Sequence, residues 1–142
     1  MKDYLVYIGT YTEEGSAGIY VYRLDMSSGG LQYISETSGL KNPSFLAISQ
    51  DQQYLYAVNE VPTSGGQPSG AVSAFSIDPA TGKLDLLNTQ STKSNGPCHL
   101  SIENTNRFVL VANYHGGGVT VLPIQADGRL GEASDYIQHV GF

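Results

Sequence analysis

The sequence is poor in cysteine and in cationic residues. Cys98 is the only cysteine, which excludes an intramolecular disulfide and fits a reducing compartment. Lysine and arginine together number only 7 and the formal net charge is −6, which argues against the clustered positive charge of a nucleic-acid surface. No segment approaches the roughly 18 apolar residues of a membrane span, and the acidic start of the chain is unlike a signal peptide. We therefore expect a cytoplasmic protein that binds neither nucleic acid nor membrane.

Two kinds of ligand site are also missing from the sequence. No set of histidine, cysteine, aspartate and glutamate residues has metal-ligand spacing, so we predict no metal. Gly116-Gly-Gly118 lacks the lysine and the following helix of a phosphate-binding loop, and we predict a hairpin turn there.

A pattern of short strands recurs along the chain. Gly9, Asn59 and Asn113 end the first strand of successive copies, at steps of 50 and 54 residues. Self-similarity at about 40 to 50 residues, with several short strands per unit, is typical of propeller blades. The apolar residues follow short, largely alternating patterns, which excludes helical repeats of similar length. We predict an all-β fold of propeller blades, each a four-stranded antiparallel sheet.

The complete unit is predicted to have four strands, at Phe45–Ile48, Tyr54–Asn59, Ala71–Ile77 and Leu84–Thr89. The first of these follows Pro43, and a matching strand follows Pro97. A proline at the start of a strand costs little, because the donor that it lacks is not needed there. We expect these short, proline-led strands to be the innermost ones, lining the central channel.

The repeats divide residues 1–142 into units at about 4–49, 50–103 and 104–142, which we predict to be the N-terminal part of a single propeller domain. The first unit begins at its second strand, so its inner strand is expected from a C-terminal part outside this chain. About two and a half to three blades fall short of the roughly four to eight that close a ring. We expect unpaired blade edges to make the isolated chain marginal or self-associating.

The residues beside the inner strands are the first candidates for a site. His99 can take a proton from water or orient a substrate oxygen, and the alternative is a hydrogen bond that locks the channel rim. Cys98 is its neighbour on a strand and faces the other side, so a nucleophile–base pair is disfavoured and a buried cysteine is expected.

Polar residues also recur at the strand ends. Asn59-Glu60 and Asn113-Tyr114 occupy matching repeat positions, and Asn42 precedes an inner strand. Glu60 can act as a base, and the amides can hold a polar ligand. An asparagine at a strand end more often bonds the following loop, so a structural role remains the alternative.

Seven runs in this order resemble the N-terminal part of the lactonase family of seven-bladed propellers, which includes the propeller-type 6-phosphogluconolactonase. The runs are Tyr7-Ile-Gly-Thr-Tyr-Thr12, Gly18-Ile-Tyr-Val-Tyr22, Asn42-Pro-Ser-Phe-Leu-Ala47, Tyr54-Leu-Tyr-Ala-Val-Asn-Glu60, Val72-Ser-Ala-Phe75, Gly96-Pro-Cys-His-Leu100 and Val111-Ala-Asn-Tyr114.

The resemblance implies hydrolysis of 6-phosphoglucono-δ-lactone to 6-phosphogluconate, a step of the pentose phosphate pathway, without a cofactor. A base deprotonates the attacking water, and cations stabilise the oxyanion and the substrate phosphate. By motif, His99, Asn59, Glu60, Asn113 and Tyr114 match positions around the family's central cleft, so we expect them to line it. We predict His99 as a catalytic residue, and Asn42, Asn59, Glu60, Asn113 and Tyr114 as residues that bind the sugar lactone. The family's main catalytic residues are expected beyond Phe142, so this chain alone should be inactive.

Two other classes of function stay open. A non-enzymatic sugar-binding propeller, closed by oligomerisation of short chains, would use Tyr11, Glu60 and Tyr114 as equivalent sites. A scaffold propeller that binds protein partners through its face would show no lactone chemistry.

Overall fold

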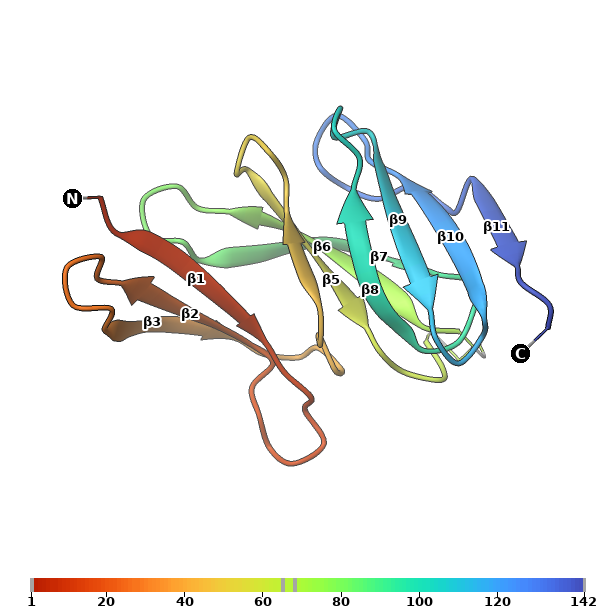
Figure 1. The fold of residues 1–142 in the computed structure, drawn as a ribbon, viewed down its shortest axis with the longest axis horizontal. Helices are drawn as coiled ribbons and strands as arrows, with labels where there is room; N and C mark the ends of the chain where they lie inside the picture. The colour runs from red at the N-terminus through yellow and green to blue at the C-terminus, as the bar shows by residue number, and fades with distance from the viewer. Residues whose placement is uncertain (1, 65, 68, 142) are drawn as a thin grey trace.

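The computed structural model describes residues 2–64, 66–67 and 69–141. Every regular element in these ranges is a β-strand, and the strands form three antiparallel sheets that lie side by side (Figure 1). The first sheet contains β1 (Tyr4–Gly9), β2 (Ile19–Leu24) and β3 (Leu31–Thr37). The second contains β4 (Leu46–Ile48), β5 (Tyr54–Asn59), β6 (Ala71–Ile77) and β7 (Leu84–Ser91), and the third β8 (Pro97–Ile102), β9 (Phe108–Asn113), β10 (Gly118–Pro123) and β11 (Asp135–Gln138).

The sheets confirm the prediction of an all-β fold built of propeller-like blades. Strand order within each sheet follows the chain, as in a meander. One hydrogen-bonded sheet ends at β3 and the next begins at β4, and the same happens between β7 and β8. The predicted units, at about 4–49 and 50–103, ended one strand later, after β4 and after β8. No helix in the described part of the chain is long and apolar enough to cross a membrane.

The short proline-led strands are the edges that face each other. β4 and β8 are each the first edge strand of a four-stranded sheet, and the two strands contact one another. The first sheet has three strands, with β1 as its edge and no fourth strand beside it among the described residues. This arrangement agrees with the expectation that the first unit lacks an inner strand of its own.

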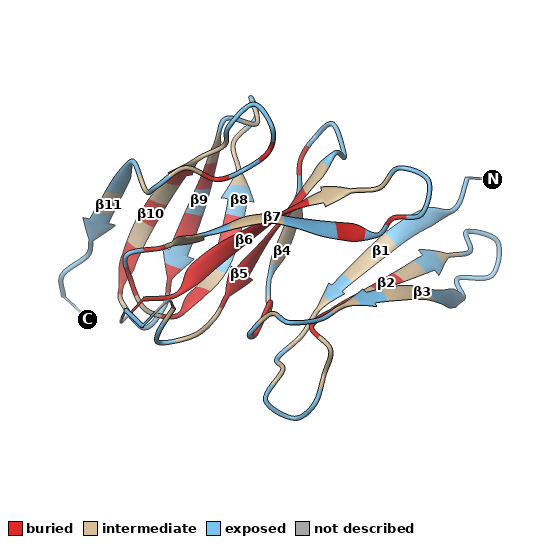
Figure 2. Ribbon diagram, turned by 180° about the vertical axis from the view of Figure 1, so that it is seen from behind, coloured by how far each residue is buried: buried red, intermediate tan, exposed pale blue. Residues whose placement is uncertain are grey.

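The core consists of two layers between neighbouring sheets, and β5 contributes to both. Leu55 and Ala57 pack toward the first sheet against Ile19, whereas Tyr56 and Val58 pack toward the third. Successive side chains of a strand point to opposite faces, so a strand covered on both faces needs an unbroken apolar run. Figure 2 shows this burial concentrated in the middle of the molecule, on β5 and β6.

Hairpins with an aspartate at the start and a glycine near the end join the outer strands. Asp25 Oδ1 accepts a hydrogen bond from Ser27 N at 2.7 Å, and Asp78 Oδ1 accepts one from Ala80 N at 2.8 Å. Gly82 has a φ of 77°, which suits glycine at the end of the second of these turns.

Tyrosines connect these hairpins to the neighbouring sheet. Tyr7 of the first sheet donates to Gly82 O at 2.8 Å, and Tyr56 of the second sheet donates to Gly128 O at 2.9 Å. Each bond runs from the second strand of one unit to the outer hairpin of the next. The same bond therefore recurs at both sheet-to-sheet interfaces.

Candidate functional site

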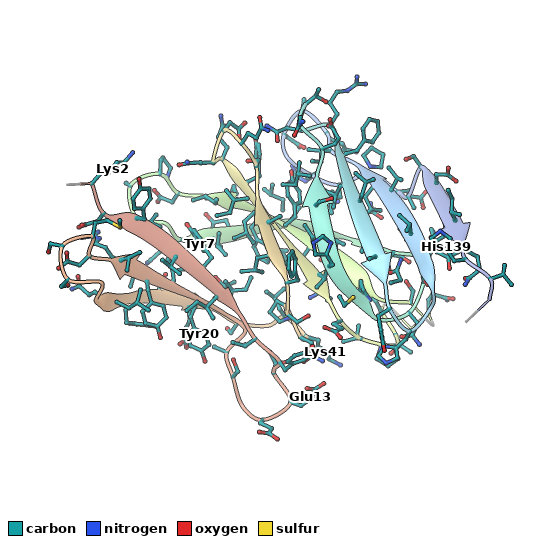
Figure 3. The ribbon with its side chains drawn as sticks, viewed as in Figure 1. Lys2, Tyr7, Glu13, Tyr20, Lys41 and His139 are labelled. Atoms are coloured by element: carbon teal, nitrogen blue, oxygen red, sulfur yellow. The ribbon has the colours of Figure 1, made fainter. Side chains whose placement is uncertain are left out.

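Two rims bound the three sheets. The first rim is the end of the sheets at which β1, β5 and β9 finish and β4 and β8 begin. The second rim is the opposite end, where the turns after Asp25, Asp51 and Asp78 lie. Figure 3 shows Glu13 and Lys41 at the first rim, which is the lower end of the molecule in this view. All of the candidate site residues belong to the segments at this first rim or to the strand β8 that starts there.

Glu60 is held by residues from two other segments. Tyr11, which follows β1, donates its hydroxyl to Glu60 Oε2 at 2.8 Å, and Ser44, which precedes β4, donates to the same oxygen. The hydrogen bond to Glu60 raises the pKa of the Tyr11 hydroxyl above its usual value, because losing the proton would place two negative charges together. The carboxylate is thus oriented by groups 49 and 16 residues away in the sequence.

Asn42 is buried beneath this cluster and fully bonded. Its Oδ1 accepts from Thr12 N at 2.9 Å and from Thr12 Oγ1 at 3.2 Å. Its Nδ2 donates to Glu13 Oε1 at 2.6 Å and to Glu60 O at 3.2 Å. Two acceptor and two donor positions are all that an amide has. Asn42 thus holds the β1–β2 loop against the end of β5, and the expected contact of Asn42 with the substrate stays a prediction.

Asn59 and Asn113 are also buried at their matching strand ends. Asn59 Nδ2 donates to Lys41 O at 3.0 Å, and Asn59 Oδ1 accepts from Ser73 at 2.7 Å, so its side chain connects loop and sheet. Asn113 Nδ2 donates to Thr120 Oγ1 at 2.9 Å. Its Oδ1 is buried and, among the described residues, without a hydrogen-bond partner. Of the three asparagines, only Asn113 has a side-chain oxygen with no hydrogen-bond partner among the described residues.

His99 is exposed and its ring contacts that of Phe45 in a tilted arrangement, with ring centroids 4.5 Å apart and an interplanar angle of 48°. The contact joins β8 to the residue just before β4, so these two aromatic rings lie together at the facing edges of the second and third sheets. Cys98 is half-buried and its Sγ lies 3.8 Å from Ala112 O. The expectation of a buried cysteine is corrected, because β8 is an edge strand that nothing described covers completely.

A hollow of about 260 Å³ opens between the second and third sheets at the first rim. It is lined by Glu60, Val61, Pro62, Asn95, Gly96 and His115. His115 was not a sequence candidate, since its position in a turn gave no signal of what it faces. Its ring lies so close to Gly96 that a β-carbon at position 96 would be 2.4 Å from Nδ1. Tyr114, by contrast, is 74% exposed and contacts the His115 ring edge-on.

A second hollow, of about 230 Å³, lies at the second rim. It is lined by Ser49, Asp51, Tyr54, Tyr56, Asn106, Arg107, Ile124, Gln125 and Ala126. No group of three or more histidine, cysteine, aspartate or glutamate residues in the described ranges could hold a metal ion.

The first rim therefore combines a fixed carboxylate, two histidines and aromatic surface. Carboxylate and imidazole groups can accept or relay protons, and both can hydrogen-bond hydroxyl groups of a ligand. The family model for lactonases with a seven-bladed β-propeller matches residues 5–142. The chain belongs to this lactonase family.

Individual relatives agree with the family. The chain is 38% identical over 141 residues to a 6-phosphogluconolactonase of Bacillus subtilis, and 30% identical over 137 residues to one of Formosa agariphila. These matches cover 99% and 96% of this chain, but 39% and 38% of the relatives. The chain thus spans about two fifths of their length.

Two solved structures have a fold similar to that of this chain. A Bacteroides fragilis protein has a TM-score of 0.90 at 40% identity, covering 98% of this chain and 37% of that protein. The periplasmic gluconolactonase PpgL of Pseudomonas aeruginosa has a TM-score of 0.87 at 33% identity, covering 97% of this chain and 39% of that protein.

Proposed function

We propose that the whole protein hydrolyses a sugar lactone of the 6-phosphoglucono-δ-lactone type, giving 6-phosphogluconate for the pentose phosphate pathway. The observation that carries the proposal is the hollow at the first rim, where Glu60 and His115 line a concave surface in a chain of the lactonase family. The reaction needs a proton acceptor for water and donors for the oxyanion, and it needs no redox group.

Within this proposal, His99 is the residue that accepts a proton from the attacking water, and Glu60 binds the substrate. His99 is exposed at the edge of β8, and Glu60 keeps a fixed direction through Tyr11 and Ser44. Tyr114 adds an exposed ring beside the hollow. Among the described residues, no lysine or arginine lines this hollow, so we propose that the cations that stabilise the substrate phosphate lie outside it.

The test is hydrolysis of 6-phosphoglucono-δ-lactone, with the spontaneous rate subtracted. We expect catalysis by the whole protein and none by the 142-residue chain alone. His99→Gln in the whole protein should lower kcat by roughly tenfold or more if the imidazole acts as a base. A whole protein that folds but does not accelerate hydrolysis would overturn the proposal and favour the sugar-binding alternative.

The cytoplasmic location expected from the cysteine usage stays a prediction. One relative, from Pseudomonas aeruginosa, is described as periplasmic, so membership of the family does not by itself decide the compartment. Fractionation of cells that express the whole protein, with detection by antibody, is the measurement that decides between cytoplasm and periplasm.

A further inference from the structure

The two carboxylate oxygens of Glu60 differ in the hydrogen bonds that they accept. Oε2 accepts hydrogen bonds from Tyr11 and Ser44, whereas Oε1 accepts none from the described residues. A carboxylate oxygen has room for about two hydrogen bonds. Oε2 is therefore occupied by the protein itself, and Oε1 is left to accept hydrogen bonds from outside it.

The position of this carboxylate is fixed by three separate segments of the chain. Tyr11 comes from the β1–β2 loop of the first sheet, Ser44 from the approach to β4, and Glu60 from the end of β5. Asn42 holds the same three segments together from below, through Thr12 and the backbone oxygen of Glu60. A group held at both a side-chain oxygen and its backbone loses little further freedom when a ligand binds, which favours affinity.

The lining of the hollow indicates which chemical groups it suits. The carboxylate of Glu60, the amide of Asn95 and the imidazole of His115 can all bond hydroxyl groups, and Val61, Pro62 and Gly96 offer apolar surface for C–H groups. A phosphate would meet an ionised carboxylate and no cation in this lining, so like charges would repel it. The lining therefore favours hydroxyl-bearing carbon over phosphate.

We propose that this hollow is the subsite for the hydroxyl groups of the sugar lactone, with Glu60 as the residue that binds them and with Tyr11 and Ser44 as positioning residues. The inference rests on the proposed function for the identity of the sugar. In this inference, residues of the second and third sheets bind the hydroxyl groups of the sugar, and the phosphate is bound elsewhere in the whole protein. Tyr11 and Ser44 act through Glu60 and need not touch the sugar.

The test is binding of D-gluconate, which carries the hydroxyl groups but no phosphate, to the whole protein by titration calorimetry. Glu60→Gln should weaken binding roughly tenfold, and Tyr11→Phe and Ser44→Ala about threefold to tenfold each, because each removes one hydrogen bond to a charged group. Tyr33→Phe is the matched control. It removes the hydroxyl of another exposed Tyr–Glu pair, Tyr33 with Glu36 at 3.3 Å on the outer strand β3, and should bind D-gluconate like the wild type.

Two further measurements distinguish a positioning role of Tyr11 from a loss of folded structure. In lactone hydrolysis, Tyr11→Phe should raise KM and leave kcat nearly unchanged, since it perturbs binding of hydroxyl groups in ground and transition states alike. The same substitution should weaken the binding of D-gluconate and the binding of 6-phosphogluconate by the same factor, because the phosphate is not bound in this hollow. Thermal unfolding of each variant checks that the fold is retained.

The outcomes distinguish this inference from the proposed function. Wild-type affinity for D-gluconate in folded Glu60→Gln and Tyr11→Phe variants, or no binding of D-gluconate by the wild type, would overturn the subsite even if the lactone is hydrolysed. Weakened binding in those variants without any hydrolysis would support the subsite and overturn the lactonase activity. If these variants lost affinity for 6-phosphogluconate but not for D-gluconate, the hollow would bind phosphate, which would contradict the inference.

Discussion

The phenol hydroxyl of Tyr56 is a buried polar group whose partner lies in another sheet. It donates to Gly128 O at 2.9 Å, and burial raises the pKa of Tyr56 well above its usual value, so it stays a neutral donor. Tyr7 makes the corresponding bond to Gly82 O from a less buried position. Both bonds connect neighbouring sheets, and the second and third sheets are also joined by two hydrogen bonds between the Asn88 side chain and the backbone of Leu130.

Removal of this hydroxyl should therefore destabilise the chain. Tyr56→Phe leaves the Gly128 carbonyl without its partner, and the expected loss in the free energy of unfolding is about 1 to 3 kcal/mol. Urea unfolding followed by circular dichroism measures it. Tyr54→Phe, two residues away on the same strand, is the control, because the Tyr54 hydroxyl has no hydrogen bond among the described residues and its loss should cost much less. Equal losses in the two variants would contradict the account.

The hairpins and turns of the second rim are elements whose stability depends on ionised carboxylates. Hydrogen bonds from the Ser27 hydroxyl and backbone hold the pKa of Asp25 at about 2, below its ordinary 3.8. Backbone N–H groups, first that of Thr105, hold the pKa of Glu103 at about 2, below its ordinary 4.5. A lowered pKa in the folded state adds stability that is present above the ordinary pKa and is lost as the pH falls toward the folded value.

The chain should accordingly lose stability on acidification between about pH 5 and pH 2. The urea midpoint, measured at a series of pH values, is expected to fall across this window in the wild type. Glu103→Gln removes one of the titrating groups, so its midpoint should fall less over the same window. A fall of equal size in both proteins would show that the bonds at Glu103 contribute nothing to the pH dependence.

The elements that the sequence predicted are those whose signals are local and repeated. Pro97 opens β8 as expected, and Asn59 and Asn113 end β5 and β9 at matching positions. β11 was not predicted, because its four residues are mostly exposed and carry little alternation. It begins only after an isolated bridge between Ile124 and Leu130 and an intervening loop, so the spacing of the earlier units did not place it.

Only part of the candidate site was predictable from the sequence, because several of its contacts join different sheets. Repeat positions indicated Glu60 and the first rim. The contact of Tyr11 with Glu60 spans 49 residues and two sheets, and His115 reaches the hollow only because the third sheet packs beside the second. Such contacts depend on how sheets are arranged, which local patterns do not specify.

At the scale of the whole molecule, the outer sheets present apolar side chains to solvent. Tyr4 and Tyr33 of the first sheet and Leu110 and Ile137 of the third are exposed, and β1 is an open edge. We propose that the 142-residue chain associates through these surfaces. Light scattering at several concentrations should give a mass above that of one chain that rises with concentration. A monomer throughout would contradict this, and a single ring-sized oligomer would favour the self-closed sugar binder.

The two hollows give the most direct test of where function lies. In the whole protein, we compare kcat/KM for 6-phosphoglucono-δ-lactone in Glu60→Gln, at the first rim, and Arg107→Gln, which lines the hollow of the second rim. We expect a loss of roughly tenfold or more for Glu60→Gln and a value near wild type for Arg107→Gln. An unchanged Glu60→Gln enzyme, or a larger loss in Arg107→Gln, would contradict the placement of the site at the first rim.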